Sequence, residues 1–209
     1  MSIKLMDIKW LWWWQLSFTT IKYKNMTKNN FYIISGGPGA GKTTLINELA
    51  NTGFVTREEE ARKIIREQLA IGGDGVPWRN KALYAQLMLK ASINTFNKTK
   101  RDNGTEIIFF DRGILDTICY MNMENTPVSD EVQYEVNTCN YNKNVFILPP
   151  WKEIYQTDDE RKQSWEEALF SFYKLKETYL QYGYNVIEIP KIPVSQRKEF
   201  VLDRISQDF

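Results

Sequence analysis

An eight-residue segment near residue 40 has the composition and spacing of a phosphate-binding loop. It fits the pattern G-x-x-x-x-G-K-[ST], follows a short β-rich run and opens a helix-forming stretch. In such a loop, glycines allow backbone N–H groups to converge on a phosphate, and the N-terminus of the following helix adds partial positive charge. The residues assigned to nucleotide binding here are Gly36, Gly37, Pro38, Gly39, Ala40, Gly41, Lys42, Thr43 and the following Thr44.

Three side chains of this segment have the chemistry that a triphosphate and its metal ion require. The ammonium of Lys42 can neutralise charge that develops on the β- and γ-phosphate oxygens. The hydroxyl of Thr43 can bind Mg²⁺, and Thr44 follows it nearer to the α-phosphate. The sequence therefore predicts ATP and Mg²⁺ as cofactors. The alternative is a glycine-rich turn in which Gly-Lys-Thr occurs by chance.

A second candidate follows the apolar run Ile107–Phe110, which has the composition of a buried parallel strand. Asp111 comes directly after this run, and ligands bind at the carboxyl ends of strands in parallel sheets. Asp111 is therefore predicted to bind Mg²⁺ or to act in catalysis; the alternative is a turn aspartate before Gly113. The neighbouring Arg112 has a guanidinium suited to phosphate, or it pairs locally with an acid such as Asp116.

Acidic residues also follow the second predicted strand, in the sequence Arg57-Glu58-Glu59-Glu60. Acids in the first turn of a helix interact favourably with its dipole, which is a sufficient structural explanation. In α/β folds of this kind, however, the end of the second strand faces the phosphate-binding loop across a cleft. Glu58 is therefore a candidate to orient or deprotonate an acceptor hydroxyl, with Arg57 and Arg112 as further substrate-binding candidates.

The composition of the 209-residue chain excludes several other chemistries. There is no histidine, which removes Ser-His-Asp and Cys-His catalytic systems and His-containing zinc sites. The two cysteines, Cys119 and Cys139, are too few for a structural zinc and favour a reducing cytoplasm over a disulfide framework. The formal charge of +1 gives no strong nucleic-acid signal. Acid–base work therefore falls to Asp, Glu, Lys or Tyr.

The elements that must position these residues alternate between strands and helices. Strands are predicted at 31–35, 54–56, 107–110, 145–148 and 186–189. Helices are predicted at 42–51, 58–69, 79–99, 164–183 and 196–207, with a glycine-rich loop at 71–77. This alternation predicts an α/β fold in which helices cover both faces of a five-stranded parallel sheet, as a three-layer sandwich. One domain is expected to cover residues 30–209.

Residues 1–29 are assigned to an N-terminal extension, because their composition differs from that of the rest. Residues 1–25 hold four of the seven tryptophans and four lysines against one aspartate. The apolar run at 10–18 is shorter than the roughly 20 residues that span a bilayer. Three interpretations stay open: an upstream extension of a reading frame that naturally starts at Met26, an interfacial membrane anchor, or an extra element packed on the domain.

Taken together, the motifs resemble those of a known family. In order, they are the glycine-rich loop, the glutamate-rich start of the second helix, Phe-Asp-Arg-Gly at 110–113, Leu-Pro-Pro-Trp at 148–151 and Asp-Glu-Arg-Lys-Gln at 159–163. Over residues 30–209 the chain resembles the small single-domain predicted ATPases of bacteria, often labelled AAA-type. Those proteins are similar to nucleoside and nucleoside-monophosphate kinases more than to AAA motors.

This resemblance implies the sheet order 2-3-1-4-5, ATP with Mg²⁺, and a lid between the fourth strand and the final helices. Arg161, in the charged run that precedes the helix at 164–183, would then contact phosphate from the lid; the alternative is a solvated face. The expected function is a Mg²⁺-dependent phosphotransferase that acts on a small nucleoside-like or other metabolite acceptor. The alternative is a nucleotide-dependent switch that hydrolyses ATP or GTP slowly.

Overall fold

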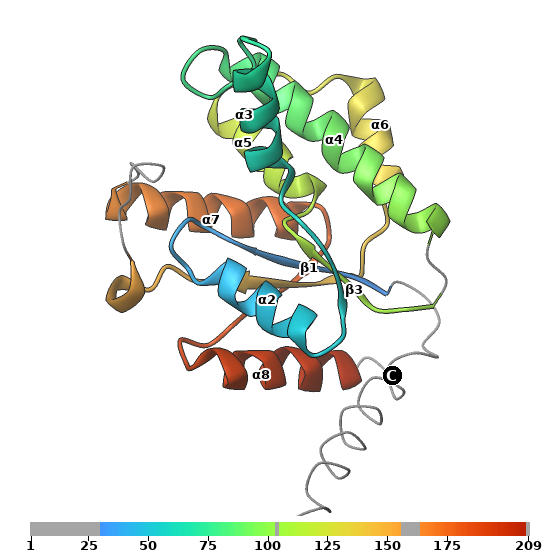
Figure 1. Ribbon diagram of the computed structural model, residues 1–209, viewed down its shortest axis with the longest axis vertical. Coiled ribbons are helices and arrows are strands. Elements are labelled where there is room, and N and C mark those ends of the chain that lie inside the picture. Colours follow the sequence, from blue (N-terminus) through green and yellow to red (C-terminus); the bar gives the residue numbers. More distant parts are fainter. Residues whose placement is uncertain (1–29, 103–104, 156–163, 208–209) are drawn as a thin grey trace, which may run out of the picture.

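Five parallel strands form the centre of the computed structural model, which describes residues 30–102, 105–155 and 164–207 (Figure 1). The sheet order is β2-β3-β1-β4-β5, and every pairing is parallel. The strands are β1 (Phe31–Gly36), β2 (Val55–Arg57), β3 (Ile108–Asp111), β4 (Asn144–Leu148) and β5 (Asn185–Glu188). Both the α/β class and the expected strand order are confirmed.

Helices cover the sheet on both faces. The helices α2 and α8 pack together on one face, and α7 lies on the other with α5 against it (Figure 1). Beyond α5, the helices α3 and α4 continue this second layer, because α4 contacts both α5 and α3. The helices are α2 (Lys42–Asn51), α3 (Glu60–Ala70), α4 (Lys81–Asp102), α5 (Ile114–Met123), α6 (Asp130–Thr138), α7 (Trp165–Gln181) and α8 (Val194–Ser206), with a 3₁₀ turn η1 (Lys152–Ile154).

Alternate residues of the central strands form two separate cores. In β1, Phe31 and Ile33 face the core beneath α4, α5 and α7, whereas Tyr32 and Ile34 face the core beneath α2 and α8. Successive side chains of a strand point to opposite faces, so a strand that is covered on both sides must be apolar throughout. All six residues of β1 are buried, which explains the apolar run of its first four residues.

The structure adds two helices that the sequence pattern did not predict. Seven of the ten residues of α5 are buried, so this helix shows no polar face from which a helical period is visible. The helix α6 does carry a start signal, because the hydroxyl of Ser129 accepts from the N–H of Val132 at 3.4 Å. The remaining predicted elements are present, with ends that differ by up to three residues.

The predicted helix over 58–69 is wrong at its start, because α3 begins at Glu60. Glu59 is its N-cap residue and has an extended backbone with no side-chain cap. Its carboxylate is engaged elsewhere, with Lys42 and Arg112. Glu58 therefore lies in the loop between β2 and α3 rather than in a helix.

Two smaller observations concern the cysteines and the membrane. Cys119 and Cys139 are both free and buried, and burial raises the pKa of each thiol to about 11. Within the described ranges, no helix combines the length and apolar character needed to cross a bilayer. The apolar run at 10–18 and the division of the chain at residue 29 fall in the part that the structure does not describe.

Candidate nucleotide and acceptor site

The glycine-rich loop connects the end of β1 to the start of α2. Gly39 and Gly41 have φ values of 74° and 82°, a left-handed conformation that glycine adopts without steric cost. Gly41 is the N-cap residue of α2, and no side chain caps this helix. The amides of the first turn are therefore available to an anionic ligand, as the helix dipole also favours.

An arginine from the C-terminal helix supports the loop from behind. The Nη1 of Arg197 donates to the carbonyl of Ala40 at 3.4 Å, and its Nε donates to the carbonyl of Ile192 at 2.8 Å. The guanidinium also lies over the ring of Trp151, 5.1 Å from its centroid. Only 6% of Arg197 is exposed, so its side chain is held in place and these contacts fix the backbone of the loop.

Lys42 and Asp111 meet at the carboxyl edge of the sheet. In the sheet register, Asp111 of β3 lies opposite Ile34 of β1, two residues before the glycine-rich loop begins. The ammonium of Lys42 donates to the carboxylate of Asp111 and lies 3.7 Å from Glu59 Oε2. Only 7% of Lys42 is exposed. Its charge is therefore compensated mainly by these two carboxylates, which hold it next to the loop.

Arg112 joins Glu59 to a second buried carboxylate. Its Nε donates to Glu59 Oε1 at 2.6 Å, and its Nη1 donates to Asp116 Oδ1 at 3.1 Å. The backbone of Arg112 has a φ of 70°, which is uncommon for a residue with a side chain and bends the chain sharply after β3. This bend directs the guanidinium to the carboxylates of both neighbouring elements.

Asp116 is almost entirely buried, and its carboxylate accepts four hydrogen bonds. Besides Arg112, the donors are Ser35 Oγ at 2.5 Å, Tyr179 Oη at 2.6 Å and the N–H of Gly113 at 2.9 Å. A buried carboxylate is tolerated when its lone pairs are satisfied in this way. Asp116 thereby connects β1, the start of α5 and α7 behind the site.

The charges around Lys42 shift the two neighbouring carboxylates in opposite directions. Burial alone would raise the pKa of Glu59, but Arg112 and then Lys42 outweigh it and lower this pKa to about 2. For Asp111, burial is the larger influence and raises the pKa above its usual value, although Lys42 opposes it. Glu59 is therefore a fixed anion, whereas Asp111 binds a proton more readily.

We expect Glu59→Gln to destabilise the fold by about 3 kcal/mol at pH 7, because the folded structure lowers the pKa of Glu59 from 4.5 to about 2. A lowered carboxylate pKa contributes stability above the unfolded-state value of 4.5, and this contribution is lost as the pH falls towards 2. The two proteins should therefore become equally stable near pH 2. Urea unfolding at a series of pH values measures the difference.

Glu58→Gln is the matched control, because Glu58 has no ion pair or hydrogen bond with another described residue. Its unfolding free energy should stay within about 0.5 kcal/mol of the parent. If the Glu59→Gln protein lost stability between pH 4.5 and 2 as steeply as the parent, the lowered pKa of Glu59 would be contradicted.

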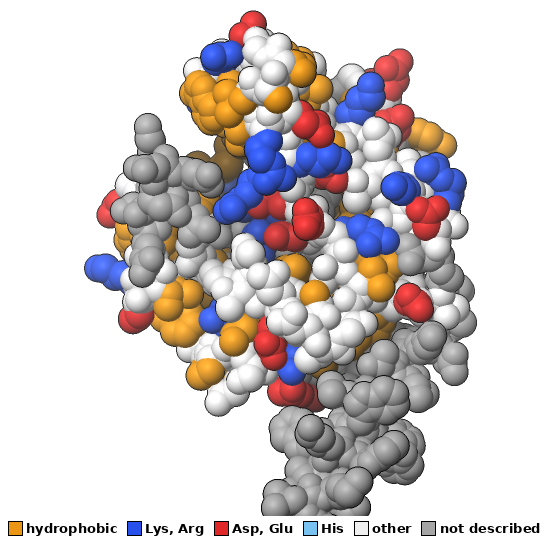
Figure 2. Space-filling model, in the orientation of Figure 1, with side chains coloured by type: hydrophobic (Ala, Val, Ile, Leu, Met, Phe, Trp, Pro, Cys, Tyr) orange, Lys and Arg blue, Asp and Glu red, His pale blue; other side chains and the backbone are white. Residues whose placement is uncertain are grey.

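Beside the loop lies a cavity of about 370 Å³, which is within the usual range for small-molecule sites. It extends from Gly37 and Pro38 to the inner sides of α3, α4 and α5. The carboxylates of Glu58 and Asp111 line it, and so does Arg112. Figure 2 shows charged side chains of both signs gathered in the middle of this face, below the hydrophobic side chains near α3.

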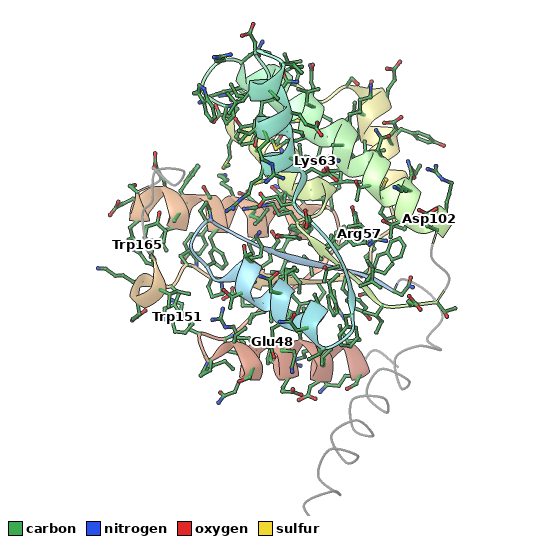
Figure 3. The ribbon with its side chains drawn as sticks, in the orientation of Figure 1. Glu48, Arg57, Lys63, Asp102, Trp151 and Trp165 are labelled. Atoms are coloured by element: carbon green, nitrogen blue, oxygen red, sulfur yellow. The ribbon has the colours of Figure 1, made fainter. Side chains whose placement is uncertain are left out.

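The structure brings together most of the residues that the sequence nominated, with two exceptions. Thr43 and Thr44 are exposed at the start of α2, and Glu58 lines the cavity. Arg57 lies beside α4 instead, because its Nε donates to Thr99 Oγ1 at 2.9 Å (Figure 3). It is not among the residues that line the cavity. Arg161 is outside the described residues, so its contact with phosphate stays a prediction.

The donor set near the loop suits Mg²⁺. Thr43 offers a hydroxyl and Asp111 a carboxylate, and Mg²⁺ prefers oxygen ligands. Among the described residues there is no cluster of three or more His, Cys, Asp or Glu that holds a metal by itself. Mg²⁺ commonly takes only one or two protein ligands and completes its shell with phosphate and water, so the pair fits this ion.

Several residues of the site carried little signal in the sequence. Glu59, not Glu58, makes the ion pairs, and a run of three glutamates gives no means to rank them. Asp116 was recognisable only as a partner of Arg112, four residues away. Arg197 and Tyr179 lie on helices whose inward face reads as ordinary core, so nothing in their spacing pointed to the loop or to Asp116.

Comparison with known proteins agrees with this geometry. The family model AAA_28, described as an AAA domain, matches residues 31–197. No curated protein matches the chain. Among solved structures, the NadR protein in complex with NR is similar over 90% of this chain and 52% of that one, with 17% identity and a TM-score of 0.63. This chain thus spans about half the length of that protein.

Two smaller kinases are similar over nearly their whole length. Deoxyadenosine kinase from M. mycoides with bound dATP has 16% identity and a TM-score of 0.53, over 84% of this chain and 99% of that one. Thymidylate kinase from Ehrlichia chaffeensis has 16% identity and a TM-score of 0.54, over 86% and 100%. At such identities the likeness establishes the fold, which is that of P-loop kinases.

Proposed function

The chain belongs to the AAA_28 family of AAA domains, and we propose that it is an ATP- and Mg²⁺-dependent phosphotransferase for a small hydroxyl-bearing acceptor. The observation that supports this most directly is the position of the cavity. It adjoins the glycine-rich loop and is lined by a free carboxylate, Glu58, and a guanidinium, Arg112. A protein that only bound and slowly hydrolysed a nucleotide would have no need of a second cavity there.

The glycine-rich loop holds the triphosphate in this proposal. The uncapped amides at the start of α2 donate to phosphate oxygens, and Lys42 moves from Asp111 towards the β- and γ-phosphates. Thr43 and the released Asp111 would then hold Mg²⁺. When bound, this ion neutralises charge on the phosphate oxygens and fixes their orientation.

The acceptor occupies the cavity with its hydroxyl towards the loop. The hydroxyl oxygen forms a bond to the γ-phosphorus, the bond from that phosphorus to the β,γ-bridging oxygen breaks, and ADP leaves. The hydroxyl proton passes to the carboxylate of Glu58, which has no other described partner. Glu59 keeps its charge, because of its low pKa, and so holds Arg112 in place beside the transfer path.

The proposal is tested by incubating the protein with Mg-ATP and a panel of nucleosides and small alcohols. We expect at least one acceptor to raise ADP release and to gain the mass of one phosphoryl group. ATP binding with no turnover against the whole panel would contradict the phosphotransferase and favour the switch.

The free, buried cysteines support our further proposal of a cytoplasmic location.

A further inference from the structure

The cavity beside the loop has an unusual charge for a site next to a phosphate-binding loop. Its charged lining residues are five acids and one base, and apolar atoms make up most of the remaining wall. The acids are Glu58, Glu59, Glu60, Asp111 and Asp116, and the base is Arg112. A site of this composition repels anions in the low-dielectric surroundings of a buried wall.

Among the described residues, the cations at this cavity are paired, except for Arg62, which acts on Glu59 from an exposed position on α3. Arg112 is bound by Glu59 and Asp116, and Lys42 is bound by Asp111 and Glu59. Lys63 lies 3.9 Å from Glu60, but its side chain is 60% exposed and its charge is largely screened by solvent. A phosphate monoester or a carboxylate needs an unpaired cation, commonly arginine in a bidentate arrangement. The described wall offers none.

The wall that α4 and α5 contribute to the cavity is aromatic and contains an unsatisfied hydroxyl. Tyr84 and Tyr120 meet edge to face, with ring centroids 5.8 Å apart and planes at 89°. Met88 and Met123 lie beside them in the lining. The Oη of Tyr120 is buried and has no hydrogen-bond partner among the described residues. A buried polar atom without a partner is costly and calls for an explanation, which a bound ligand supplies.

We propose, on the basis of the phosphotransferase function above, that the acceptor is an uncharged or cationic hydroxyl compound with a flat ring, such as a nucleoside. The charge of the described wall disfavours phosphate monoesters and carboxylates. The ring packs against Tyr84 and the methionines, and a polar ring atom bonds the hydroxyl of Tyr120. The reactive hydroxyl points to Glu58 and the loop. The reaction therefore makes a phosphate monoester rather than extending one.

The experiment compares matched pairs that differ only in a phosphate: deoxyadenosine with dAMP, and thymidine with dTMP. Calorimetry measures the Kd of each with the full-length protein, alone and saturated with Mg²⁺ and a non-hydrolysable ATP analogue. We expect at least one nucleoside to bind at least tenfold more tightly than its monophosphate. Equal or tighter binding of the monophosphates would overturn the proposal, as would failure of all four to bind to protein that binds the analogue.

A second measurement isolates the hydroxyl of Tyr120. Tyr120→Phe should weaken binding of the preferred nucleoside about three- to tenfold, because one hydrogen bond is lost, and should leave the Kd of the ATP analogue unchanged. Tyr134→Phe, at an exposed tyrosine of α6, is the matched control and should change neither. Equal nucleoside affinity in Tyr120→Phe and the parent would remove Tyr120 from the acceptor site.

These outcomes separate the two proposals. If the protein did not bind the ATP analogue but bound a nucleoside more tightly than its monophosphate, the phosphotransferase would be refuted and the acceptor class would stand. Turnover with dAMP or dTMP as the better acceptor would support the phosphotransferase and refute the acceptor class.

Discussion

Replacing Lys42 with methionine is expected to lower phosphoryl transfer from ATP by about 1,000-fold. The ammonium of Lys42 lies at the first residue of α2, next to the loop, so its loss removes charge neutralisation on the β- and γ-phosphates. ATP affinity should fall as well. Acceptor-dependent ADP release measures the first effect, and calorimetry with Mg-ATP the second.

The same substitution leaves Asp111 and Glu59 without their shared cation. Removing one partner from a buried ion pair commonly costs 3–5 kcal/mol. Asp111 can limit this cost by taking up a proton, since burial already raises its pKa. We therefore expect Lys42→Met to remain folded but less stable, which circular dichroism and thermal unfolding will report.

Lys198→Met is the matched control. Lys198 is also largely buried and also contacts α2, where its ammonium lies 3.2 Å from Glu48 Oε1. It is remote from the loop's phosphate side, so turnover should stay within about twofold of the parent. Unchanged turnover in Lys42→Met, or an equal loss in Lys198→Met, would contradict the assignment of the nucleotide site.

Asp111→Asn is expected to separate nucleotide binding from turnover. The asparagine cannot hold Mg²⁺ as a carboxylate does, so transfer with Mg-ATP should fall by about 100-fold or more. Without Mg²⁺, ATP should bind as tightly as to the parent or more tightly, because Lys42 no longer has an anionic partner at this position. Calorimetry with and without Mg²⁺ measures both affinities.

Asp203→Asn, at an exposed position of α8, controls for the general effect of removing one carboxylate. Its turnover and its response to Mg²⁺ should match those of the parent. If Asp111→Asn retained the parent's turnover and Mg²⁺ dependence, Asp111 would have no part in the mechanism.

The fold and the nucleotide half of the site were predictable because their signals are local. The strand Phe31–Gly36 is followed at once by the glycine-rich loop, and helix α2 starts at Lys42 as expected. The apolar run before Asp111 likewise identified both a buried strand and the acid at its end. In each case the period of the sequence and the chemistry of a few adjacent residues coincide.

The proposed acceptor half was less predictable because it depends on side chains brought together from distant elements. The choice of Glu59 over Glu58 as the ion-pairing acid follows from the direction of the chain after β2, which no periodicity reveals. Tyr120 lies on α5, whose burial on nearly all sides hid the helix itself. The position of Arg57 beside α4 was unpredictable for a related reason, since its partner Thr99 lies 42 residues away.

The contact of Arg197 with the backbone of Ala40 has a thermodynamic consequence for ligand entry. Because the guanidinium is already held by Ile192 and Trp151, the glycine-rich loop keeps its shape when empty. Little ordering entropy is then lost when a nucleotide arrives, and association should proceed at a rate set by diffusion and charge. Removing the contact between Arg197 of α8 and the carbonyl of Ala40 would therefore slow the association of ATP, although Arg197 itself need not touch the nucleotide.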